Sequence, residues 1–164
     1  MRKVLREFTA KHGGVILPFA MLPKTHQLAI VWYMAVNGEA WEILFDFDRK
    51  DDCHNTKNKK ILEKVLPEYV KKYGKIKFGV ITLSTALCKR MLMQEREVKQ
   101  DWKNFDAYHK WYQDCSGNPT HKRKNPWPCI LGSDFKNEFI EDGWHRFHRY
   151  VQLKMLSIPC VYYP

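Results

Sequence analysis

The segment from Phe139 to Tyr163 constrains the fold of this chain more than any other, because its pattern predicts several elements in a fixed order. Asn137 to Glu141 is typical of a returning strand, and Asp142-Gly143 then turns the backbone. Apolar residues at helical spacing follow, and Ser157-Ile158-Pro159 opens a last strand that ends at Tyr163. The pattern therefore predicts a strand, a glycine turn, a basic helix and a closing strand.

The turn Asp142-Gly143-Trp144-His145-Arg146 is the predicted phosphate-binding site. A strand that turns through glycine into a helix directs several unpaired backbone N–H groups and the positive helix end to one spot. Basic side chains oppose the helix dipole there, so a bound phosphate would relieve the conflict. Gly143 permits close approach, and Arg146 can grip two oxygens. The competing interpretation is a structural helix entry, with Trp144 in the core and His145 and Arg146 solvated.

Three side chains at this turn are candidate catalytic residues. A histidine such as His145 can transfer protons near neutral pH, although its position also suits simple phosphate binding. Glu141 and Asp142 could hold a Mg²⁺ ion bound to a nucleotide, because Mg²⁺ usually takes one or two carboxylates together with phosphate oxygens. Their alternative role is that of a solvated strand end.

Asp46 and Asp48 form a separate candidate metal site. The sequence predicts a strand here, from which alternate side chains project on the same face and could bind a divalent cation. Nucleases need such carboxylates to position their metal. An acidic loop after an edge strand is the commoner arrangement.

Residues 127–164 resemble the C-terminal half of the ParB/sulfiredoxin superfamily. The resemblance lies in the run from Phe139 to Arg146, in the helix to Met155 and in Ser157-Ile158-Pro159-Cys160-Val161. It implies a single α+β domain over residues 1–164, with a small mixed sheet packed with helices. It also implies that ATP or another nucleoside triphosphate binds at the turn. Gly143, His145 and Arg146 match the phosphate-contacting positions of the superfamily.

The chain departs from sulfiredoxins at Trp144, which stands where those enzymes place their reactive cysteine. Sulfinic acid reduction is therefore not expected. Relatives of the fold carried by plasmids and phages include ATPases, DNA nucleases and inhibitors of conjugation, and this short basic chain is most similar to those. The resemblance thus implies a nucleotide-binding, DNA-associated protein of a mobile element, which could be an ATPase or nuclease. The alternative is a non-catalytic inhibitor or interaction protein that uses the same fold as a basic scaffold.

The charge of the chain favours a polyanionic partner. Its 28 Lys and Arg residues against 18 Asp and Glu residues give a formal net charge of +10. The predicted nucleic-acid contacts are Lys122, Arg123 and Lys124 in a basic loop, together with Arg149 on the C-terminal helix. Lysines between Lys57 and Lys75 form a second basic tract, for which a solvated helix face is the usual explanation. We expect the partner to be nucleic acid, with DNA favoured, or a nucleic-acid-processing protein complex.

The cysteines and the apolar runs bear on location. The five cysteines show no C-x-x-C spacing, which favours a reduced, cytoplasmic environment. No apolar run reaches the ~18 residues that a membrane-spanning helix needs. We therefore expect no association with a membrane.

The rest of the chain is expected to contain strands and helices in alternation. Residues 1–23 are predicted to form an extended arm with an opening strand at Val15 to Phe19. Leu28 to Val36 and Trp41 to Phe47 flank Asn37-Gly38 and predict a β-hairpin. Helical spacing covers Thr56 to Lys72, and Pro67 is expected to break this run into two short helices or to start the second of them.

Further predictions concern the middle of the chain. Lys75 to Leu83 alternates like a strand, and Ser84 or Thr85 could cap the helix that follows. Ala86 to Tyr112 is long enough for two helices, and Cys115 to Pro128 is expected to be an exposed loop because it contains one glycine and three prolines.

Overall fold

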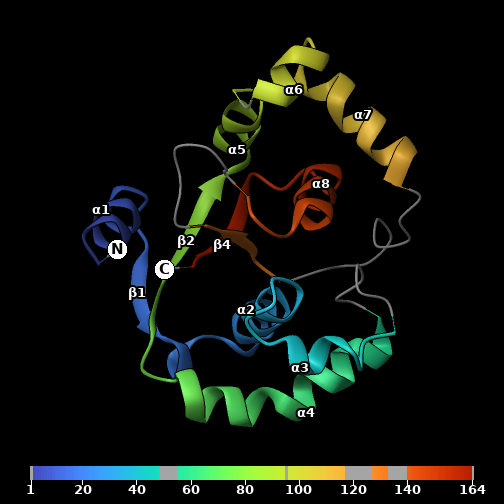
Figure 1. Cartoon of the computed structure of the whole chain (residues 1–164). Coiled ribbons are helices and arrows are strands. Elements are labelled where there is room, and N and C mark those ends of the chain that lie inside the picture. The colour runs from blue at the N-terminus through green and yellow to red at the C-terminus, as the bar shows by residue number, and fades with distance from the viewer. Residues whose placement is uncertain (1, 49–54, 95, 117–126, 133–139, 164) are drawn as a thin grey trace.

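A four-stranded mixed sheet lies at the centre of the computed structural model, which describes residues 2–48, 55–94, 96–116, 127–132 and 140–163 (Figure 1). The strand order is β1-β2-β4-β3. Neighbouring strands are antiparallel except β3 and β4, which run parallel. The strands are β1 (Val15–Pro18), β2 (Lys77–Ser84), β3 (Cys129–Leu131) and β4 (Ser157–Tyr162). The predicted α+β class with a small mixed sheet is thus confirmed.

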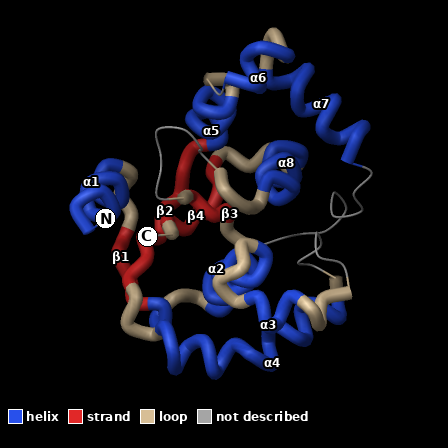
Figure 2. The backbone as a smooth tube through the Cα atoms, in the orientation of Figure 1, coloured by secondary structure: helices blue, strands red, loops and turns tan. Residues whose placement is uncertain are grey.

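Helices surround the sheet, and Figure 2 shows the strands between two groups of them. The helices are α1 (Arg2–Lys11), the short 3₁₀ helix η1 (Phe19–Met21), α2 (Lys24–Val36), α3 (Trp41–Leu44), α4 (Thr56–Tyr73), α5 (Thr85–Leu92), α6 (Arg96–Asp101), α7 (Phe105–Ser116) and α8 (Trp144–Gln152). Within the described ranges, no helix is long and apolar enough to cross a membrane.

Two hydrophobic cores lie on opposite faces of the sheet, because successive side chains of a strand point to opposite sides. Phe78, Ile130 and Val161 pack with α2 and α4 on one face. Leu83 and Cys160 pack with α1, α5, α7 and α8 on the other. The sheet is therefore buried on both faces between layers of helices.

The predicted β-hairpin at Asn37-Gly38 is wrong, because Leu28 to Val36 belongs to helix α2 and residues 41–44 form helix α3. Every residue of α2 from Gln27 to Ala35 is buried. A helix that is surrounded by other elements is apolar on all sides, so its sequence lacks the polar stripe that would identify it. Asn37 ends α2, and Gly38 follows it with φ of 83°, a conformation common after a helix as well as in a hairpin.

The N-terminal arm and the break at Pro67 are also wrong. Residues 2–11 form helix α1, which packs on β2, and β1 pairs with β2 in the sheet, so this region is not an extended arm. Helix α4 continues through Pro67 for 18 residues. Asn55 caps its first turn by accepting hydrogen bonds from the N–H groups of Lys57 and Asn58.

Other predictions of secondary structure agree with the fold to different degrees. The opening strand, the strand before Ser84 and the Ser84 cap are confirmed. The region predicted as two helices contains three, α5, α6 and α7. The C-terminal helix and closing strand are confirmed as α8 and β4. Of the predicted strand before the turn, residues 137–139 lie outside the described residues, and Asp142 forms an isolated bridge with Ile130.

Candidate functional site

Gly143 turns the chain into helix α8 with φ of 104°, a left-handed conformation that favours glycine. A Cβ atom at Gly143 would lie 2.9 Å from Nε of Arg146. The arginine side chain therefore folds back under the turn and fills the space beside the glycine. Gly143 thus allows the close approach of an arginine of the same chain, whereas the sequence predicts the close approach of a phosphate at this position.

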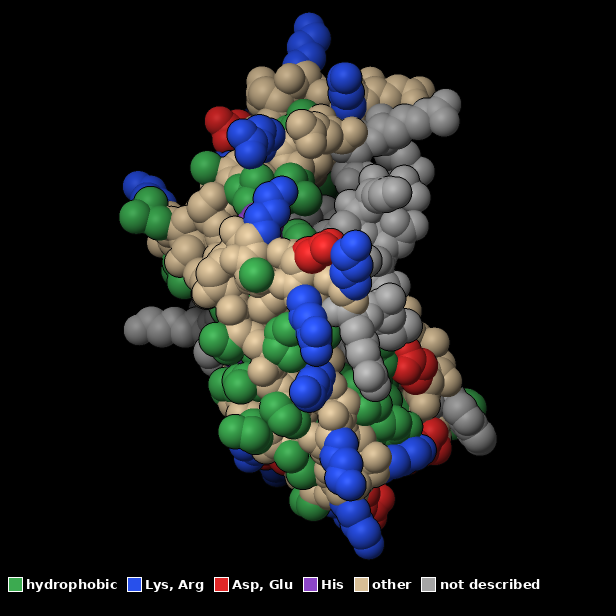
Figure 3. All heavy atoms as spheres, turned by 90° about the vertical axis from the view of Figure 1, so that its left-hand side faces the viewer, with side chains coloured by type: hydrophobic (Ala, Val, Ile, Leu, Met, Phe, Trp, Pro, Cys, Tyr) green, Lys and Arg blue, Asp and Glu red, His purple; other side chains and the backbone are tan. Residues whose placement is uncertain are grey.

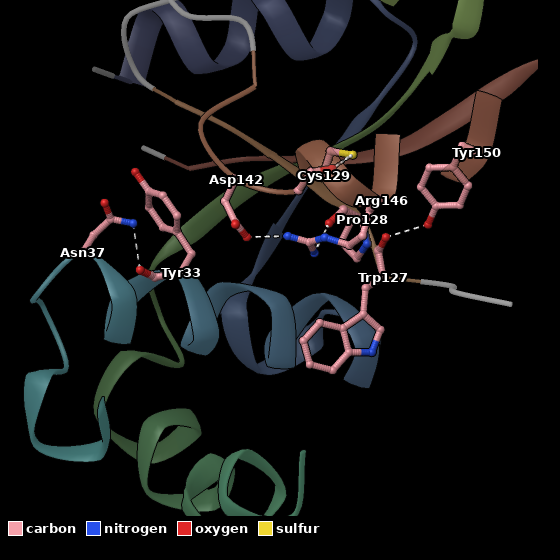
Figure 4. Close-up of polar contacts among 9 residues, drawn as sticks. Tyr33, Asn37, Trp127, Pro128, Cys129, Asp142, Arg146 and Tyr150 are labelled. Atoms are coloured by element: carbon pink, nitrogen blue, oxygen red, sulfur yellow. Dashed lines mark hydrogen bonds and ion pairs between the residues drawn. The ribbon is translucent and has the colours of Figure 1, made fainter. Parts of the chain in front are cut away.

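Arg146 is buried, with 4% of its surface exposed. Its guanidinium forms an ion pair with Asp142 and donates a hydrogen bond of 2.6 Å to the carbonyl of Pro128 (Figure 4). Tyr150 of the same helix donates to the neighbouring carbonyl of Trp127 at 2.6 Å. These contacts fasten α8 to the start of β3, so the guanidinium is engaged within the protein and does not form an open grip for an anion.

Glu141 also makes contacts within the protein. The hydroxyl of Tyr33 donates a hydrogen bond to its carboxylate, and burial, followed by this hydrogen bond, raises the pKa of Tyr33. The Glu141 carboxylate also lies where a side chain at residue 132 would begin, since a Cβ on Gly132 would fall 1.2 Å from Oε1. Glu141 and Asp142 thus connect β3, α2 and α8, which does not fit the role of open Mg²⁺ ligands.

The histidines of α8 face helix α7. His145 is half-buried, with Nδ1 3.2 Å from the hydroxyl of Tyr112. His148 is fully buried, and its Nδ1 lies 2.6 Å from Nδ1 of His109, so one ring donates the proton and the other accepts it. The ring of Tyr112 stacks on that of His148 with centroids 3.8 Å apart. These contacts indicate that the helix interface determines where the histidines lie.

Trp144 and Arg149 also make contacts within the protein. Trp144 packs against the core that contains Phe147, and its ring meets Phe147 edge to face. Arg149 is half-buried and donates to Gln152 at 3.2 Å. The other predicted nucleic-acid contacts, Lys122, Arg123 and Lys124, lie outside the described residues.

Asp46 and Asp48 do not lie on a strand, so the geometric basis of the predicted metal site is wrong. They follow helix α3 in a loop. Asp48 lies 3.7 Å from the ammonium of Lys57, and its N–H donates to Asn58. Across the described ranges there is no group of three or more His, Cys, Asp or Glu side chains that could hold a metal ion.

Three of the cysteines lie in the protein core as thiols. Cys88, Cys129 and Cys160 are free and buried. Burial raises the pKa of Cys88 and of Cys129 to about 12, and it raises the pKa of Cys160 well above the usual value. Since the thiolate is the reactive form, these three residues act as small core residues and not as nucleophiles.

A basic turn, defined as residues 71–77, joins α4 to β2. It contains four lysines and no acidic residue in the run KKYGKIK. Lys71, Lys72, Lys75 and Lys77 are all exposed, and none forms a salt bridge with another described residue. Figure 3 shows Lys and Arg side chains along the face on which α1 and the C-terminal end of α4 lie. This segment is a concentrated source of positive charge that can reach a ligand.

An aromatic pocket opens beside the basic turn, with a volume of about 340 Å³. Its lining residues are Phe19, Ile30, Met34, Glu39, Tyr73, Ile76, Phe78 and Tyr163. Tyr73 and Ile76 belong to the basic turn, while Tyr163 follows β4. Pockets that bind small molecules are mostly apolar and carry a few polar groups, and this one is of their size.

Sequence patterns did not predict this pocket. Glu39 follows Asn37-Gly38, for which the sequence predicts a hairpin turn. Tyr163 is predicted to end a strand, so neither residue is expected at a binding site. One signal was present, because Tyr73 stands among the lysines of the basic turn, and aromatic rings between cations are typical of surfaces that bind unpaired bases. The contacts across the pocket join residues too far apart in sequence to be predicted from spacing.

Three kinds of comparison with known proteins found no match for this chain. No family model matches its sequence, no curated protein matches it, and no solved structure matches its fold. The resemblance of residues 127–164 to the ParB/sulfiredoxin superfamily therefore rests on the motif residues alone. The geometry of the basic turn, the aromatic pocket and the α8 turn is therefore the basis for a proposed function.

Proposed function

We propose that this chain is a nucleic-acid-binding protein that holds the phosphate backbone of DNA with the basic turn. The observation that carries the proposal is the set of four exposed lysines within seven residues, without an acidic neighbour in the run and without a salt bridge to another described residue. Lysines that form no salt bridge can displace the counterions of a phosphate backbone, and the release of those ions supplies most of the binding free energy.

The rest of the molecule supports binding in preference to catalysis. Glu141, Asp142 and Arg146, which a nucleotide hydrolase or nuclease would need at an open site, make contacts within the fold. The net charge of +10 supplies a positive field that attracts polyanions from a distance. The proposal thus takes the form of a non-catalytic DNA-binding scaffold, which suits an inhibitor or interaction protein of a mobile element.

The narrower expectation is a ParB/sulfiredoxin-like domain that binds ATP or another nucleoside triphosphate. The proposal includes this expectation only in the form of phosphate binding by the backbone N–H groups of α8. Gly143 is left-handed and immediately precedes the helix, so the first N–H groups of α8 are the phosphate ligands that this form of the proposal requires. Arg146 does not contribute, because its guanidinium is engaged by Asp142 and Pro128.

Fluorescence anisotropy with a labelled single-stranded DNA dodecamer tests the proposal. The variant with Lys71, Lys72, Lys75 and Lys77 all changed to Gln should bind at least about tenfold more weakly, because it loses four phosphate contacts. A matched control changes Lys59, Lys60, Lys64 and Lys110 to Gln, four exposed lysines elsewhere on α4 and on α7. Both variants have the same net charge, so a nonspecific effect of charge would weaken them equally.

Two results would contradict the proposal. The first is failure of the unmodified protein to bind DNA at low salt, and the second is equal loss of affinity in the two variants. Calorimetric titration with ATP, CTP and GTP in the presence of Mg²⁺ tests the narrower form separately. If none of the three nucleotides binds, the α8 backbone is not a triphosphate site, whereas the proposal for the basic turn is unaffected.

A further inference from the structure

The aromatic pocket has a buried apolar floor and a polar rim. Phe19, Ile30 and Phe78 are buried at 3% exposure or less, whereas Ile76 at the rim is 43% exposed. The rings of Phe19, Tyr73, Phe78 and Tyr163 contribute to the lining. A flat, uncharged aromatic ligand fits such a lining, because it can stack on or meet these rings while it displaces water from the apolar floor.

Glu39 supplies a hydrogen-bond acceptor at the rim. The hydroxyl of Tyr163 donates to its Oε2 at 2.5 Å, and burial together with this hydrogen bond raises the pKa of Tyr163, so the phenol keeps its proton. Oε1 of Glu39 makes no hydrogen bond to another described residue. A carboxylate has about four lone-pair sites, so Glu39 can accept two further donors from a ligand while Tyr163 holds it in place.

The basic turn contributes Tyr73 and Ile76 to the lining of the same pocket. The ammonium of Lys72 lies 4.9 Å from the centroid of the Tyr73 ring, and that ring lines the pocket. Since Tyr73 and Ile76 belong to the same short segment as Lys72 and Lys75, a neutral ring that is attached to a phosphate could contact the pocket with its ring and these lysines with its negative charge.

We infer that the aromatic pocket receives one unpaired guanine base of a single-stranded nucleic acid, with Glu39 reading its Watson–Crick edge. Guanine is the DNA base that presents two neighbouring donors there, N1–H and an N2 amino hydrogen, and a carboxylate can accept both. Stacking on aromatic side chains and hydrogen bonds to the exposed base edge are the usual means by which proteins recognise unpaired bases. The inference rests on the proposed function, because the lysines of the basic turn hold the adjoining phosphates.

Competition between DNA strands tests the assignment. Labelled dodecamers contain thymine at every position except one central base, which is guanine, inosine, adenine, cytosine or thymine. The protein should bind the guanine strand about tenfold more tightly than the all-thymine strand, the scale of a hydrogen bond to a charged group. Inosine lacks the N2 amino group, so its strand should bind with intermediate affinity.

Glu39→Gln should abolish the preference for guanine, so that the guanine and all-thymine strands bind this variant equally, and circular dichroism should show the same helix content as in the unmodified protein. Asp106→Asn is the matched control, since Asp106 is an exposed carboxylate on α7, and it should keep the preference. Equal binding of all five strands, or a guanine preference that survives in Glu39→Gln, overturns the inference and leaves the proposed function in place. If no strand binds, both are overturned.

Discussion

The sequence predicts that Arg146 binds a phosphate, because it lies in the first turn of a helix. A basic side chain opposes the helix dipole there unless an anion lies nearby. An anion is indeed nearby, but it is the carboxylate of Asp142, four residues earlier in the chain. The sequence pattern predicted the turn at Gly143, the start of the helix after it and the need for a negative charge near Arg146. It could not show that the charge is intramolecular, because this depends on the burial of Arg146 against Pro128 from another part of the chain.

Asp142→Asn should lower the free energy of unfolding by about 3 kcal/mol, because the buried guanidinium of Arg146 would lose its counter-charge. Urea denaturation followed by circular dichroism measures the change. Asp106→Asn, which alters an exposed carboxylate in the first turn of α7, should shift the free energy by less than about 1 kcal/mol, the scale of its interaction with the helix dipole. Equal small shifts in both variants would mean that the ion pair contributes nothing measurable to stability.

At the scale of elements, the sequence pattern predicts a hairpin where the structure has helix α2 and the turn that ends it. Asn-Gly between two apolar runs favours a hairpin, but the same dipeptide also ends helices, since both uses need a residue with positive φ. Only the burial of α2 on all sides distinguishes the two, and burial is a property of the assembled fold. Helix α4, by contrast, has one polar face and was located correctly from its periodicity.

Pro67→Ala tests the continuity of helix α4. Pro67 is exposed within an unbroken helix, where proline costs about 3 kcal/mol through a missing hydrogen bond and a steric clash. Proline also restricts the unfolded chain, which offsets about 1 kcal/mol. The substitution should therefore raise the free energy of unfolding by about 1 to 2 kcal/mol in urea denaturation.

The neighbouring substitution Glu68→Ala, also at an exposed position of α4, serves as the control and should change stability by less than about 0.5 kcal/mol. If Pro67→Ala destabilised the protein, the proline would instead be the favourable first residue of a second helix, as the sequence suggested. That result would contradict the continuous helix.

At the scale of the whole molecule, the net charge of +10 favours a polyanionic partner but does not indicate where that partner would bind. The α+β class was implied by the resemblance of the C-terminal region and is confirmed, and the lysines of the basic turn belong to a longer basic tract in the sequence. The pocket beside them requires α2, α4, β2 and the end of β4 to meet. Such long-range contacts arise only when the sheet brings residues 39, 73 and 163 together.

The dependence of DNA affinity on salt concentration tests the central claim most directly, because each lysine–phosphate contact contributes a fixed increment. For single strands the slope of log K against log salt concentration is about −0.7 per neutralised phosphate. The variant with all four basic-turn lysines changed to Gln should therefore have a slope smaller in magnitude by up to about 3. The control variant with four other lysines changed should keep the slope of the unmodified protein. Identical slopes for the unmodified protein and the basic-turn variant would contradict the account.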